Sequence, residues 1–125
     1  MSQVASIGHD GGRLVLARYL EPLAPYLADH TLTEIVVNCP GEVFVEGPGG
    51  WTRHEATALT QTYLSHLATA AASHTRQDIG PDYPVVSTSL TGEERCQIVV
   101  PSAVPGGMIS LTIFAPDSRQ ESSPL

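Results

Sequence analysis

The chain has 125 residues, a length that fits one domain with its own hydrophobic core. Its formal net charge is −7, and an acidic domain does not attract a phosphate backbone, which disfavours autonomous nucleic-acid binding. All six basic residues are arginine, and there is no lysine. A P-loop needs a lysine to reach the β- and γ-phosphates, so the composition excludes P-loop nucleotide hydrolysis by this chain alone.

The two ends of the chain have a different composition from its middle. Residues 1–12 are polar and Gly-rich, which predicts a flexible leader and contains no signal peptide. Residues 116–125 are polar and predict a linker or tail, which leaves 13–115 as the folded domain. No run approaches the roughly 18 apolar residues of a membrane span. We therefore expect a cytoplasmic protein, which can still sit at the inner membrane on a membrane-bound partner.

The first predicted element covers residues 13–29. Four leucines at helical spacing form one face: Leu16, Leu20, Leu23 and Leu27. Pro22 and Pro25 interrupt this pattern, because proline lacks an amide donor and crowds the preceding turn. The pattern predicts a kinked helix or two short ones.

A β-meander follows this helical region. Residues 33–38 are rich in β-branched side chains and predict a strand. Residues 39–42 (CPGE) suit a type II turn, with proline second and glycine third. Residues 42–46 alternate and predict a second strand, 47–50 (GPGG) a turn, and 51–55 a third strand.

The rest of the chain predicts one helix and three more strands. Thr60 is a candidate N-cap for a helix that runs to about His74. Its predicted buried stripe consists of Tyr63, Leu64, Leu67, Ala68 and Ala71. Alternating strands are predicted over residues 85–90, 95–100 and 108–114. Strands and helices do not alternate as in a parallel sheet, so we predict an α+β fold, an antiparallel sheet of about six strands with helices on one face.

The cysteines, two histidines and the tryptophan are the residues to consider for a disulfide, a metal site or a contact. Cys39 and Cys96 are not a C-x-x-C pair, so two reduced thiols are favoured over a disulfide between them, and a small thiol enzyme is a minor alternative. His66 and His74 are eight residues apart on one predicted helix, about 12 Å along its axis, too far to share a metal ion. We predict no metal site and no catalytic residue. Trp51 is expected to be a core residue or a subunit contact.

Five stretches of the chain match a known family in wording, order and spacing: LEPLAPYLADHTLTEIVVNCPGEVFVEG, GGWTRHEATALT, PVVSTSL, GEERCQIVVPSAVPGG and SLTIFAP. Between Leu14 and Phe114 the chain resembles the amino-terminal domain of the VirB-type traffic ATPases of type IV secretion and conjugal DNA transfer. The resemblance implies a PAS-like sheet, a hexameric ring, and a separate carboxy-terminal ATPase domain that carries the P-loop. It also implies that ATP with magnesium binds between the two domains, and that other secretion components at the inner membrane are partners.

The resemblance implies an assembly and regulatory domain of a nucleotide-binding ATPase that powers translocation of DNA or protein. This chain alone should neither bind nor hydrolyse ATP. The alternative is a stand-alone PAS-like interaction module that regulates a full-length traffic ATPase.

One residue is carried over from the family as a candidate nucleotide contact. Arg95 in GEERCQ matches an arginine that the family places toward the nucleotide, and a guanidinium can clamp phosphate oxygens. Phe114 stands where the family usually has a second arginine, and a phenyl ring cannot bind phosphate. Glu93 replaces a glycine and brings a negative charge near Arg95, while Cys39 and Ser102 also depart from the family pattern.

Overall fold

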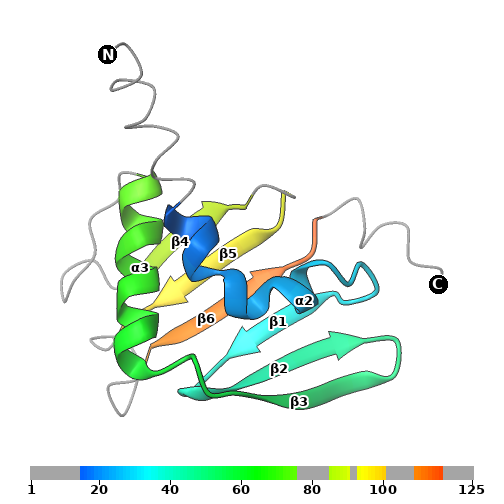
Figure 1. The fold of residues 1–125 in the computed structure, drawn as a ribbon. Coiled ribbons are helices and arrows are strands. Elements are labelled where there is room, and N and C mark those ends of the chain that lie inside the picture. Colours follow the sequence, from blue (N-terminus) through cyan, green and yellow to red (C-terminus); the bar gives the residue numbers. More distant parts are fainter. Residues whose placement is uncertain (1–14, 76–84, 91–92, 101–108, 117–125) are drawn as a thin grey trace.

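Six strands form one antiparallel sheet in the order β3-β2-β1-β6-β5-β4 (Figure 1). The computed structural model describes residues 15–75, 85–90, 93–100 and 109–116. The strands are β1 (Glu34–Val37), β2 (Gly41–Gly47), β3 (Gly50–Ala56), β4 (Val85–Ser89), β5 (Arg95–Val99) and β6 (Ser110–Phe114). The predicted antiparallel α+β fold is confirmed, and β6 lies at the centre of the sheet between β1 and β5.

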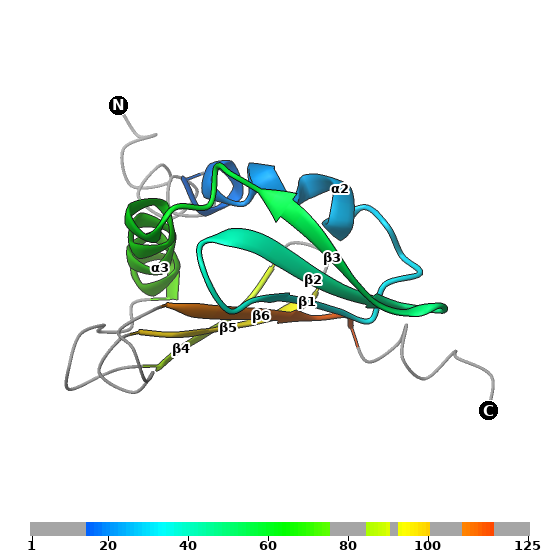
Figure 2. The same cartoon turned by 90° about the horizontal axis from the view of Figure 1, so that it is seen from below.

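The helices lie on one face of this sheet, as predicted (Figure 2). Residues 15–19 are helical, and the 3₁₀ turn η1 (Glu21–Leu23) and the short helix α2 (Ala24–Leu27) follow. Pro22 and Pro25 each fall in the first turn of one of these pieces, where a missing amide donor breaks no helical hydrogen bond. The two prolines therefore divide the predicted kinked helix into short segments.

The longer helix α3 (Gln61–Thr75) begins where its cap was predicted. The backbone N–H of Tyr63 donates to the Thr60 hydroxyl over 3.0 Å, which satisfies one of the amides that an α-helix leaves unpaired. Leu67 and the alanines of the predicted stripe are buried. Tyr63 differs from the prediction, because it is only half-buried and its hydroxyl donates to the carbonyl of Tyr19 over 3.1 Å.

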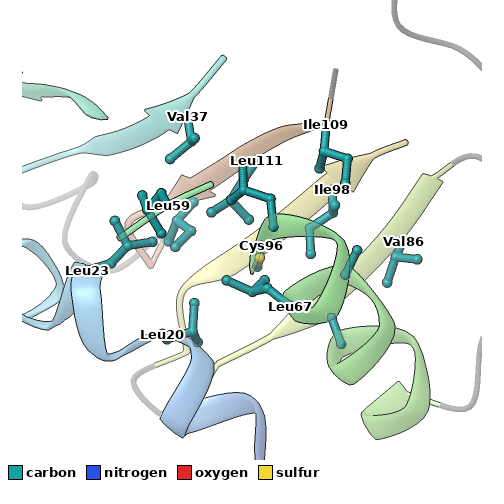
Figure 3. Packing of buried hydrophobic residues seen from close by; sticks show 14 of the residues in the cluster. Leu20, Leu23, Val37, Leu59, Leu67, Val86, Cys96, Ile98, Ile109 and Leu111 are labelled. Atoms are coloured by element: carbon teal, nitrogen blue, oxygen red, sulfur yellow. The ribbon is translucent and has the colours of Figure 1, made fainter. Parts of the chain in front are cut away.

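The core lies between the helices and the sheet (Figure 3). Strand side chains alternate between the two faces, and the apolar ones on the helix side of β1, β2, β4, β5 and β6 are at most 4% exposed. This set comprises Ile35, Val37, Val43, Val45, Val86, Cys96, Ile98, Leu111 and Ile113. The opposite face carries no helix among the described residues, and we call it the open face.

The turns of the meander follow the sequence prediction, and one side chain does not. Gly41 has φ of +86°, which is the conformation required at the third position of the predicted type II turn. Pro48 and Gly49 connect β2 to β3. Trp51 is 50% exposed, so the core interpretation of this residue is wrong. It lies on β3, an edge strand, and the subunit-contact interpretation stays a prediction.

Both cysteines are free thiols, as favoured from their spacing. Cys96 is buried under the helices, and desolvation raises the pKa of its thiol to about 12. The predicted leader 1–12, the tail after Pro116 and Ser102 lie outside the described residues. The domain bounds therefore stay predictions.

Candidate functional site

Arg95 and Phe114 are neighbours on the open face. Arg95 is the first residue of β5. Its Cα partner on β6 is Phe114, and its partner on β4 is Ser89. Directly opposed residues in an antiparallel pair point to the same side of the sheet. The structure thus brings together Arg95, the candidate nucleotide contact, and Phe114, which stands where the family usually has a second arginine. Their register could not be read from the sequence, because β5 and β6 are joined by a long connection.

The guanidinium of Arg95 stacks on the ring of Phe114. Its ζ carbon lies 5.4 Å from the ring centroid, within the range of a cation–π contact. Such a contact at an exposed site contributes about 0.5–1 kcal/mol. Arg95 is exposed and Phe114 is half-buried, so the ring is the less mobile partner. The phenylalanine that departs from the family pattern is therefore in contact with the arginine that keeps it.

A hollow of about 430 Å³ lies beside this pair. Arg95 and Phe114 line it together with residues of β4, β5 and the end of α3: Thr75, Ser87, Thr88, Ser89, Cys96 and Gln97. A guanidinium flanked by hydroxyl and amide groups can donate several hydrogen bonds to an oxyanion. The polar residues of this hollow were not predicted as part of a site. The strand sequences alternate with period two, but only the pairing of β4 with β5 brings Ser87 and Ser89 beside Arg95.

The turn before Arg95 holds Glu93 in an unusual backbone conformation. The Leu90 N–H donates to the Glu94 carbonyl over 2.8 Å, and the Glu93 N–H donates to the Leu90 carbonyl over 2.9 Å. This is the pattern of a three-residue hairpin loop whose last residue is left-handed, and Glu93 has φ of +69°. Glycine adopts this conformation without steric strain, which gives a physical reason for the glycine usual at this position in the family.

Replacing Glu93 with glycine is expected to stabilise the protein by about 0.5–1 kcal/mol. The substitution relieves a left-handed strain of about 1–2 kcal/mol, and the extra chain entropy of glycine when unfolded offsets part of this gain. Urea denaturation of the Glu93→Gly variant measures the change. Glu93→Ala serves as the control, because it removes the charge and keeps the strain. Equal stabilisation by both variants would show that charge, and not backbone conformation, is responsible.

The row of residues that contains Arg95 becomes acidic beyond Phe114. On the other side of Phe114 stands Glu34 of β1, and opposite Glu34 stands Glu46 of β2. Burial and the nearby Glu46 carboxylate raise the pKa of Glu34. Thr33 Oγ1 donates to Glu46 Oε1 over 3.1 Å. An anion on the open face would therefore meet favourable charge at the Arg95 end and repulsion at the Glu34 end.

Several other polar side chains of the first three strands and the turn before β2 have structural partners. Arg53 forms an ion pair with Glu42, with Nη2 and Oε2 2.8 Å apart, and the Cys39 thiol donates to Glu42 Oε1 over 3.4 Å. The ring of His54 lies 5.2 Å from that of Tyr26. Within the described ranges, no three metal-ligating side chains gather into a group that could hold an ion. Among those same residues, no helix is long and apolar enough to cross a membrane.

Comparison with known proteins agrees with the fold and the motifs. No family model matches the chain. The type IV secretion system protein PtlH of Bordetella pertussis is 46% identical over 101 residues, which are 81% of this chain and 30% of PtlH. VirB11 of Bartonella henselae is 44% identical over 100 residues, 80% of this chain and 28% of VirB11. The crystal structure of the VirB11 ATPase of the Brucella suis type IV secretion system, in complex with sulphate, superimposes with a TM-score of 0.82 at 38% identity. That match covers 91% of this chain and 36% of the solved chain.

Sequence and fold together show that the chain belongs to the VirB11 and PtlH family of type IV secretion system proteins. It corresponds to the amino-terminal domain of the VirB11 and PtlH proteins, as the resemblance predicted. The chain spans about 30% of the length of the curated relatives it matches.

Proposed function

We propose that this chain is the assembly and nucleotide-facing domain of a traffic ATPase that powers type IV secretion of DNA or protein. In this proposal six copies form a ring in the cytoplasm at the inner membrane, in contact with other secretion components. A carboxy-terminal domain supplies the P-loop and binds ATP with magnesium. The single observation that carries the proposal is the match to VirB11 in both sequence and fold, at 38% identity and a TM-score of 0.82.

Within this proposal Arg95 supplies one positive charge to the phosphates of a nucleotide held mainly by the ATPase domain. Its exposure beside a hollow that also carries serine and glutamine side chains supports this role. A guanidinium in a water-poor interface makes charge-assisted hydrogen bonds worth about 1.5–3 kcal/mol. The chain by itself should not turn over ATP, because it has no lysine for a P-loop.

The proposal is tested by a chimera that joins this chain to the ATPase domain of a full-length VirB11-type protein, in place of that protein's own amino-terminal domain. We expect ring assembly by native mass spectrometry and ATP turnover. Arg95→Gln should lower turnover about 10- to 100-fold without dissolving the ring. The matched control is Arg53→Gln, since Arg53 lies on the same face and is paired with Glu42. A chimera that folds and fails to assemble would overturn the proposal.

A second candidate is a stand-alone module that joins rings of a full-length traffic ATPase and regulates them. The observation that favours it is Phe114, since a phenyl ring in place of the usual second arginine leaves one fewer side chain to bind phosphate. Titrating the chain into a purified full-length ATPase distinguishes the two. A change in the ATP turnover of the full-length protein when the chain is added in equimolar amount supports the module, and unchanged turnover argues against it.

A further inference from the structure

We propose that Phe114 is a positioning residue for Arg95. Its ring holds the guanidinium on the open face, beside the hollow, where a single phosphate group can be bound. This inference rests on the proposed function, in which Arg95 meets a phosphate. It assigns a role to a residue that cannot itself contact an anion.

The contact geometry is the first support. Arg95 and Phe114 are direct cross-strand partners, and the ζ carbon lies 5.4 Å from the ring centroid. The ring belongs to the central strand β6 and is half-buried, which limits its rotation. An arginine side chain loses much rotamer freedom when it binds a ligand, and a side chain already held in place loses less.

The charges along the row are the second support. Going across the sheet from Arg95, the next residue is Phe114 on β6. Glu34 on β1 follows, and then Glu46 on β2. Neighbouring strands lie about 4.8 Å apart, so a long arginine side chain without the ring could lean toward these carboxylates. Phe114 occupies the intervening position and offers the guanidinium the face of a neutral ring. The cation is thereby kept at the end of the row that carries Ser89.

The shape of the site follows from these two points. Arg95, Ser87, Ser89 and Gln97 line the same hollow, and their donors suit one oxyanion. A second arginine at position 114 would place two like charges opposite each other across β5 and β6. The structure has one cation supported by a ring instead. The ligand class is a terminal phosphate group of a polyphosphate.

The test has two readouts. Side-chain NMR of the isolated chain reports the stacking of Arg95 on Phe114, and calorimetry measures the binding of inorganic tripolyphosphate to the chimera, because the chain alone is not expected to bind a nucleotide. In the unliganded protein, the ring should shift the Arg95 signals upfield. Phe114→Leu should abolish this shift and weaken tripolyphosphate binding about two- to fivefold, while Phe114→Tyr should preserve both. Phe44→Leu, on the same face of β2, is the matched control and should leave both unchanged.

The outcomes separate this inference from the function on which it rests. If Arg95→Gln weakens tripolyphosphate binding by the chimera while Phe114→Leu binds as the parent chimera does, the positioning role is wrong and the phosphate contact stands. If the Arg95→Gln chimera binds tripolyphosphate as tightly as the parent chimera, both the contact and the positioning role are wrong. Ring assembly by the chimera would remain a separate result in either case.

Discussion

Replacing Leu67 with alanine is expected to lower the free energy of unfolding by about 3 kcal/mol. Leu67 is 1% exposed on the side of α3 that faces the sheet (Figure 3). Removing its isobutyl group loses apolar burial and leaves a cavity, and such changes in cores range over about 2–5 kcal/mol. A domain of this size is stable by only about 5–15 kcal/mol, so the loss is a large share of the total.

Urea denaturation followed by circular dichroism measures this change. Ser65→Ala, an exposed change on the same helix, serves as the control and should alter the stability by less than about 0.5 kcal/mol. A loss below about 1 kcal/mol for Leu67→Ala would contradict the packing of α3 on the sheet. Such a small loss would mean that α3 shifts to fill the cavity, or that it is loosely packed on the sheet.

The second large effect is a loss of stability at alkaline pH through Cys96. Burial raises the pKa of this thiol from 9.0 to about 12. Above pH 9 the unfolded chain releases the thiol proton while the folded chain keeps it. Because the folded state then binds more protons, stability from this group is fully present below about pH 9 and is lost as pH rises toward 12. The expected slope is at most about 1.4 kcal/mol per pH unit.

Comparing the parent with Cys96→Ala between pH 8 and about 10.5 measures this contribution. The parent should lose stability more steeply than the variant above pH 9, and the two curves should run parallel below it. Cys39→Ala is the control, since Cys39 is only partly buried and most of the slope should remain. Parallel curves over the whole range would show that the Cys96 thiol ionises in the folded state as readily as in the unfolded one.

The candidate site was only partly predictable. Arg95 was found because a family motif surrounds it, and the motif also identified Phe114 and Glu93 as departures. The stacking of Arg95 on Phe114 could not be predicted, because a strand sequence does not specify its cross-strand partner. Trp51 was assigned two roles from its size, and only its 50% exposure excludes the core.

The local elements follow from the sequence alone. Proline spacing divides the first helix, Thr60 caps α3, and alternation marks the buried faces of β2, β5 and β6, because these features depend on neighbours within a few residues. Tertiary structure alone decided the strand order and register, since long connections let β6 insert between β1 and β5. That insertion places Phe114 between Arg95 and Glu34 on the open face.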